Sequence, residues 1–179
     1  MIERGCAWVL VWLGLFSPLQ SPALELWPSL RIVKDDQAQL SPAQAWAASQ
    51  LPTALTLERA NQVLGAANSP PHWAAWTLRR AEFQAHPLWL SLHSPTQDVS
   101  ELWVQQGEGP WIAVPSMNAQ AQGLGQGYLW PTWALPSTNA EHVNLLLRVE
   151  GPNRVQFPLA LEDPVHYQRR QQVLMLFMG

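Results

Sequence analysis

The sequence predicts an all-β protein, an antiparallel, jelly-roll-like β-sandwich with one short helix near residues 42–49. Three observations favour this fold class. Charged residues make up only 13% of the 179-residue chain, about half of the usual share of roughly 25%. Eleven tryptophans and sixteen prolines are typical of short strands and ordered loops rather than of disorder. Short alternating segments separated by turns indicate a sandwich or barrel rather than a βαβ fold.

The first 23 residues have the pattern of a secretory signal peptide. Arg4 supplies a positive charge, an apolar run follows at 7–16, and Ser21-Pro22-Ala23 puts small residues before a cleavage site. The run is shorter than the about 20 residues that span a bilayer. We therefore expect residues 1–23 to be removed on export. The alternatives are an uncleaved anchor or a buried strand.

The segment 24–40 is expected to form a strand that runs into a turn at Lys34-Asp35-Asp36. The motif Ser41-Pro42-Ala43-Gln44 then has the chemistry of a helix start. Serine suits the N-cap, proline the first helical position, and glutamine completes a capping box. This motif predicts the short helix over 42–49.

Alternation with a period of two then predicts a series of strands. In one of them Leu88, Leu90 and Leu92 share one face, while Trp89 and His93 share the other. Strands are expected at 73–79, 88–92, 100–104, 111–114 and 128–130, with a loop at 115–127.

A hairpin is predicted near the C-terminus. Two alternating segments, 143–149 and 155–161, flank the turn sequence Gly151-Pro152-Asn153. Arg148 is expected to face solvent on the first of these strands and to pair with Glu150 or Glu162.

The last residues change from polar at 166–172 to entirely apolar at 173–179. Seven residues cannot span a membrane, but they can begin a helix that does. The sequence thus divides into a signal peptide (1–23), an extracytoplasmic sandwich (24–170) and the start of a truncated transmembrane helix (171–179).

Composition and motifs exclude several functions. The net charge of −3 leaves no basic excess for nucleic acid. The single cysteine, Cys6, rules out a disulfide framework and a thiolate metal site. The histidines show no metal-ligand spacing, so we expect no metal and no cofactor.

No catalytic motif occurs in the sequence either. The glycines at 123, 125 and 127 lack the strand–helix context of a dinucleotide fingerprint. Asp98 and Glu101 are expected to point to different faces, whereas glycoside hydrolysis needs two carboxylates in one cleft. We therefore predict that the protein is not an enzyme, and a glycan-cleaving enzyme ranks third among our hypotheses.

Tryptophan is the best candidate for ligand recognition, since its broad apolar face and single donor suit stacking on sugars. Trp89 and His93 share one face of strand 88–92, and Glu101 and Trp103 share one face of strand 100–104. If these strands are neighbours, the four side chains form one amphipathic platform. The alternative is that the tryptophans pack within the sandwich or under the 42–49 helix.

Several motifs occur in a characteristic order: His72-Trp-Ala-Ala-Trp-Thr-Leu78, Asp98-Val-Ser-Glu-Leu-Trp103, Gly109-Pro-Trp111, Leu146-Leu-Arg-Val149 and Phe157-Pro-Leu159. Over roughly residues 30–179 this order resembles the jelly-roll extracellular domain of bacterial seven-transmembrane receptors with diverse intracellular signalling modules (the DISM receptors). Residues 120–127 depart from the family pattern, because they lack an arginine that it often has.

The resemblance implies a sensory domain that binds a small-molecule or carbohydrate ligand and is joined to the membrane by a missing C-terminal transmembrane region. The expected location is the periplasmic face of the bacterial inner membrane. The alternative is a free-standing, exported periplasmic carbohydrate-binding protein.

Overall fold

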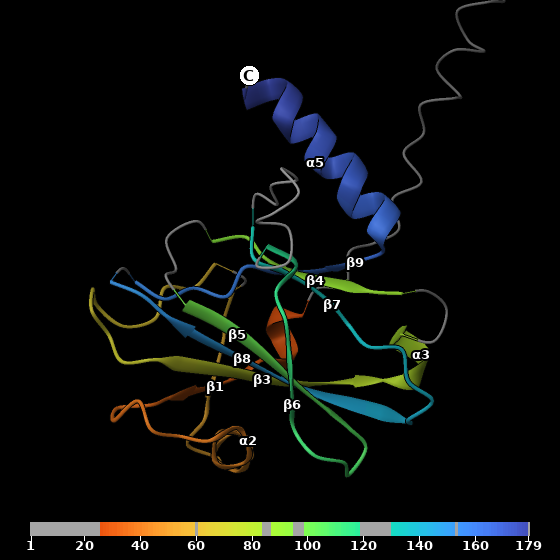
Figure 1. The fold of residues 1–179 in the computed structure, drawn as a ribbon. Helices are drawn as coiled ribbons and strands as arrows, with labels where there is room; N and C mark the ends of the chain where they lie inside the picture. The colour runs from red at the N-terminus through yellow and green to blue at the C-terminus, as the bar shows by residue number, and fades with distance from the viewer. Residues whose placement is uncertain are drawn as a thin grey trace, which may run out of the picture.

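The protein is a sandwich of two antiparallel β-sheets (Figure 1), which confirms the predicted all-β class. In this computed structural model the described residues are 26–59, 61–83, 87–94, 99–118, 130–152 and 154–178. The predicted signal peptide, Asp98 and most of the 115–130 region therefore lie outside the described residues.

The larger sheet has six strands in the order β2-β1-β3-β8-β5-β6. The smaller sheet has three strands in the order β7-β4-β9. The strands are β1 (Arg31–Lys34), β2 (Leu55–Thr56), β3 (His72–Arg79), β4 (Trp89–Leu92), β5 (Val99–Gln106), β6 (Ile112–Val114), β7 (Thr132–Ala134), β8 (His142–Glu150) and β9 (Leu159–Glu162). The strands predicted at 73–79, 88–92, 100–104 and 111–114 thus correspond to β3, β4, β5 and β6.

The main core lies between the two sheets. Its larger members include Trp76, Trp133 and Phe157, together with the inward-facing leucines and valines of the strands. The alternation of β8 explains its position, since Val143, Leu145, Leu147 and Val149 face this core. The residues between them face the other side of the sheet.

The predicted hairpin at 143–161 is wrong. β8 pairs with β3 and β5, whereas β9 pairs with β4 in the other sheet. Between β8 and β9 the chain crosses from one sheet to the other, with one bridge between Val155 and Leu64. Pro158 lies in this crossing and has no backbone N–H to continue a ladder. Both segments still bury their predicted faces, but against different partners.

The predicted short helix is present as α2 (Pro42–Ser49). Both hydrogen bonds of the capping box form between Ser41 and Gln44, as the motif indicates. α2 packs on the outer face of the six-stranded sheet, where Ala45 is completely buried. Two further short elements, η1 (Trp27–Ser29) and α3 (Arg80–Phe83), were not predicted.

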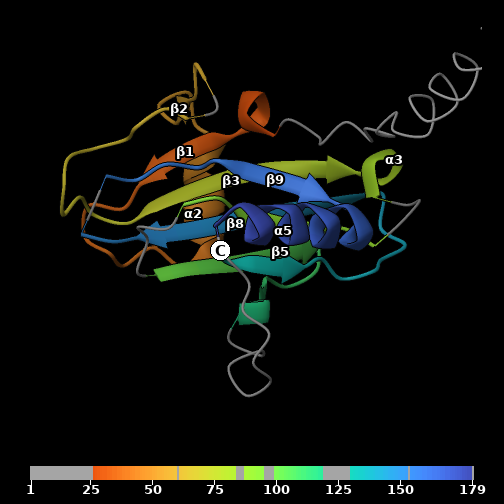
Figure 2. The ribbon, with the colours of Figure 1, turned by 90° about the horizontal axis from the view of Figure 1, so that it is seen from above.

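The chain continues from β9 into a longer helix, α5 (Pro164–Met178). The polar and apolar parts of the predicted C-terminal region therefore form one helix that begins at Pro164. α5 rises on the outer side of the three-stranded sheet (Figure 1) and lies over it when seen from above (Figure 2). Within the described part of the chain, no helix combines the length and apolar character needed to cross a membrane.

Candidate functional site

The four residues of the predicted platform lie in different sheets. Trp89 in β4 and His93 just after it belong to the three-stranded sheet, whereas Glu101 and Trp103 in β5 belong to the six-stranded sheet. The assumption that their strands are neighbours is wrong, because β4 and β5 belong to different sheets. The four side chains therefore do not form one surface, and ligand binding by any of them stays a prediction.

Trp89 and His93 do share the outer face of β4, as the alternation predicted, and this face carries α5. The Trp89 ring lies edge-on to Tyr167 of α5, with 5.4 Å between ring centroids. His93 Nε2 lies 2.8 Å from an Arg170 guanidinium nitrogen and 2.9 Å from Ser91 Oγ. Two of the predicted site residues thus contact the C-terminal helix.

His93 is a neutral imidazole in this position. Burial and the Arg170 charge together lower the pKa of His93 from its ordinary 6.5 to about 4. An arginine can only donate hydrogen bonds, so Nε2 of His93 accepts from Arg170 and the ring proton lies on Nδ1. Arg170 also forms an ion pair with Glu162 of β9.

Tyr167 anchors α5 through a directed chain of hydrogen bonds. Thr132 Oγ1 donates to the Trp130 carbonyl at 2.9 Å, so its single proton is already used. The Tyr167 hydroxyl therefore donates to Thr132 Oγ1, at 2.9 Å, and accepts from the side-chain amide of Gln171. Tyr167 and Gln171 are both buried. The outer face of the smaller sheet is thus an interface with α5.

Trp103 and Glu101 lie on the outer face of the six-stranded sheet. The register aligns Trp103 with Leu146 of β8 and Ala113 of β6. Trp103 packs against a second apolar cluster on this face, which is made of Ala45, Trp73, Ala75 and Leu146, with Trp46 and Trp111 at its margin. Its indole Nε1 is buried and has no hydrogen-bond partner among the described residues.

Trp46 and Trp111 form an aromatic pair next to Trp103. Their ring centroids are 5.6 Å apart, with the planes tilted by 53°. Trp46 comes from α2 and Trp111 directly precedes β6, so the helix and the sheet edge meet through these rings. All three tryptophans are only partly buried and leave apolar ring surface exposed.

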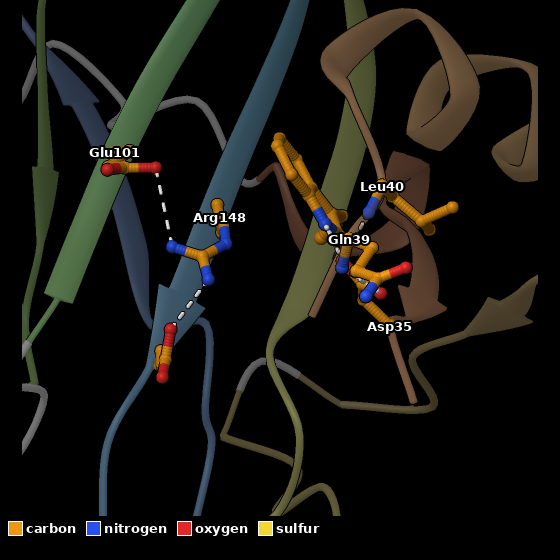
Figure 3. Close-up of polar contacts among 7 residues, drawn as sticks. Asp35, Gln39, Leu40, Glu101 and Arg148 are labelled. Carbon is orange, nitrogen blue, oxygen red and sulfur yellow. Dashed lines mark hydrogen bonds and ion pairs between the residues drawn. The ribbon is translucent and has the colours of Figure 1, made fainter. Parts of the chain in front are cut away.

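Charged side chains lie beside this aromatic surface. Arg148 of β8 lies between two carboxylates, with Glu150 at 2.6 Å and Glu101 at 3.5 Å (Figure 3). The Arg148 side chain is 18% exposed, against 50% for Glu101 and 42% for Glu150. The predicted pairing of Arg148 with Glu150 is confirmed, and Glu101 is a second partner.

Asp35 supports the other side of this face. It follows β1, is buried, and accepts hydrogen bonds from the backbone N–H groups of Gln39 and Leu40 and from Trp73 Nε1 (Figure 3). Burial alone would raise the pKa of Asp35, but these hydrogen bonds, with the Arg148 charge, outweigh it and lower the pKa. Asp35 thus holds the turn before α2 and orients Trp73.

A polar row borders the face on the other side. Thr77 Oγ1 donates to Asn144 Oδ1 at 2.9 Å, Asn144 donates to Gln105 at 3.1 Å, and Gln105 donates to the Gly109 carbonyl at 2.8 Å. These residues occupy one register row across β3, β8 and β5. The row joins three strands and holds the turn that leads to Trp111.

We call this surface the aromatic–carboxylate face: Trp46, Trp103, Trp111, Glu101, Arg148 and Glu150. Two carboxylates against one guanidinium give a local charge of −1, which disfavours anionic ligands. Carboxylates accept hydrogen bonds from hydroxyl groups, and indole rings stack on apolar faces. Among the described residues no cluster of histidine, cysteine or carboxylate side chains could hold a metal ion.

Some of these residues could have been found in the sequence and others could not. Glu101, Trp103 and Arg148 follow from strand alternation. Trp46 lies on a helix whose two faces hardly differ in hydrophobicity. The sequence around it therefore gave no indication that it lies next to Trp111. The role of Asp35 depends on a turn that the sequence indicated only in outline.

The two sheets, with the aromatic–carboxylate face on one and α5 on the other, can be compared with known families. The family described as 7TMR-DISM extracellular 2 matches this chain over residues 28–163. The chain belongs to this family, as the resemblance in the sequence predicted. The family consists of exported, extracytoplasmic sensory domains of receptors and is not a known type of enzyme. No curated protein matches the chain.

Proposed function

We propose that this sensory domain binds an uncharged, polyhydroxylated ligand, such as a carbohydrate, on the aromatic–carboxylate face. The observation that supports the proposal most is the position of the Trp46–Trp111 pair and Trp103 beside Glu101, Arg148 and Glu150. Indole rings can stack on the C–H faces of a sugar ring while the carboxylates accept its hydroxyl protons. The exposed edge of the face suits an extended or branched ligand rather than one enclosed in a pocket.

We further propose that α5 connects the domain to a membrane segment on the periplasmic side of the bacterial inner membrane. The family match ends at residue 163 and α5 begins at Pro164. Contacts of Tyr167 and Arg170 hold the first turns of the helix to the sandwich, and the helix then continues into the apolar residues from Val173 onward. A ligand can change the position of α5 only by binding its docked and undocked states with different affinity.

Titration of the purified protein with neutral oligosaccharides, followed by calorimetry, tests the ligand class. Truncation of a central binding residue typically costs more than about 1 kcal/mol, so Trp111→Ala should weaken binding by about fivefold or more. Trp130→Ala is the matched control, because Trp130 is also partly buried but lies beside His93, on the outer face of the other sheet. The two variants should differ in affinity and not in melting temperature.

Glu101→Gln tests the part played by the carboxylate. It keeps the shape of the side chain but removes the charge, so sugar affinity should fall while the protein stays folded. Glu108→Gln, in the exposed turn after β5, is the control and should bind like the parent. If Glu101→Gln and Trp111→Ala both bind the sugar with the affinity of the parent, the ligand lies elsewhere on the protein.

A further inference from the structure

The sandwich is hollow at the end where β3 finishes and β4 begins. A cavity of about 410 Å³ lies between the sheets there. Leu78 and Val143 line it from the six-stranded sheet, and Leu88 and Leu135 line it next to the ends of β4 and β7. Phe83 of α3 borders it as well, and α3 lies at this end of the sandwich in Figure 1. The main core is therefore not fully closed at this end.

A second hollow of about 300 Å³ adjoins the first and shares Pro136 with it. Val104, Ile112 and Val114 line it from the larger sheet, and Ala134 lines it from β7. Among the described strands, β6 and β7 are the outermost of their sheets, so this hollow lies between two edge strands. The side chain of Ile112 is 56% exposed in this position.

The lining of both hollows is apolar with a few neutral polar groups. None of the described residues that line either hollow carries a formal charge. In the first hollow the polar side chains gather at one rim, on Ser137, Thr138 and Asn139, and Gln106 lines the second hollow. Thr138 Oγ1 accepts from the backbone N–H of Ala140, and its own proton can still be donated. A charged ligand would lose its hydration here without gaining an ionic partner.

We propose that the first of these hollows, the cavity of about 410 Å³, is a second binding site. It takes an uncharged small molecule with an apolar body and one hydroxyl or amide group. The apolar body would lie between Leu88, Leu135 and Phe83, and the polar group would reach the rim at Ser137–Asn139. The volume falls in the range of small-molecule pockets, about 300–1,000 Å³. This ligand differs in chemistry from the sugar proposed for the aromatic–carboxylate face, and its site lies between the sheets instead of on an outer face.

The position of the cavity relates it to α5. The Leu135 backbone N–H donates to the Leu88 carbonyl at 2.9 Å, which closes the end of the β4–β7 pair. Trp89, the next residue after Leu88, contacts Tyr167 on the opposite face, and Thr132 of β7 bonds to the same tyrosine. A molecule in the cavity would therefore lie against the two strands that hold α5.

N-phenyl-1-naphthylamine, a neutral apolar fluorophore, is a suitable probe for the purified protein. Its fluorescence should rise in a saturable way, whereas 8-anilinonaphthalene-1-sulfonate, a similar fluorophore with a negative charge, should bind at least tenfold more weakly. Ser137→Trp places a large ring at the exposed rim without altering the core and should reduce binding of the neutral probe by tenfold or more. Thr53→Trp, at an exposed turn away from the cavity, is the control and should bind like the parent.

Three results would overturn the proposal: no saturable binding of the neutral probe, equal binding by Ser137→Trp and the parent, or equal affinity for the two probes. Sugar titration of Ser137→Trp separates this proposal from the preceding one. Unchanged sugar affinity with lost probe binding supports two independent sites, whereas loss of both assigns the sugar to the cavity and removes the second site.

Discussion

Removal of one oxygen atom, by Tyr167→Phe, should loosen α5 from the sandwich. The Tyr167 side chain is 1% exposed, and its hydroxyl joins the Gln171 amide to Thr132 Oγ1. In the variant the buried Gln171 side chain loses its acceptor and Thr132 loses a donor, although Thr132 keeps its bond to the Trp130 carbonyl. A buried polar group left without its partner costs about 1–3 kcal/mol. The ring, and with it the contact to Trp89, is retained.

Hydrogen exchange of the α5 backbone amides measures this effect directly. A loss of about 1–3 kcal/mol in docking free energy corresponds to exchange that is about 5- to 150-fold faster. The amides of β3 and β8 should exchange at nearly the parental rate if the helix opens locally. In urea, a cooperative loss of about 2 kcal/mol would lower the midpoint by about 1 M, for a denaturant slope of about 2 kcal/mol/M.

The matched control is Thr53→Val, which removes a hydroxyl from an exposed turn residue and should change neither measurement. Parental exchange rates in α5 of Tyr167→Phe, together with a parental urea midpoint, would refute the proposed role of the Tyr167 hydroxyl. The Trp89 contact and the Arg170 contacts with Glu162 and His93 would then be left to hold the helix.

Three further predictions follow from individual residues. Asp35→Asn should lower the free energy of unfolding by about 1–3 kcal/mol at neutral pH. Because the pKa of Asp35 is lowered from 3.8, the difference in unfolding free energy between variant and parent should shrink as pH falls through and below that value. A difference in urea melts that does not change with pH would contradict this prediction. His93, with its pKa lowered from 6.5 to about 4, binds a proton more readily in the unfolded chain, so the stability of the protein should decrease as pH is lowered from about 6.5 to about 4. His93→Gln should flatten this pH dependence. An NMR titration that gives His93 a pKa near 6.5 would contradict the burial argument. N-terminal sequencing of exported protein should begin near Leu24, and an intact Met1 would disprove cleavage.

Features that depend on neighbouring residues were predictable from the sequence. The capping box at Ser41 and Gln44 forms α2 because its two hydrogen bonds span only three residues. The alternation in 88–92 correctly put Leu90 and Leu92 in the core and Trp89 on the other face. In the turn before β6, Gly107 adopts a positive φ of 55°, which glycine tolerates better than other residues.

Features that depend on strand partners were not predictable in this way. The platform hypothesis failed because alternation assigns a side chain to a face of its own strand and says nothing about which strand lies beside it. The hairpin prediction failed for the same reason, since a turn motif after β8 is compatible with a return in the same sheet or a crossing to the other. Trp46 and Trp111 meet although 65 positions separate them in the chain.

The sequence by itself thus determined the fold class, the family, the start of α2 and the buried face of most strands, because these follow from local hydrogen bonding and from the period of the apolar residues. Only the tertiary structure decided that Glu101 and Trp103 lie beside Arg148 while Trp89 and His93 lie under α5. The physical reason is that strand pairing and sheet packing join residues far apart in the chain. The free energy of those contacts depends on the whole core and not on any short segment.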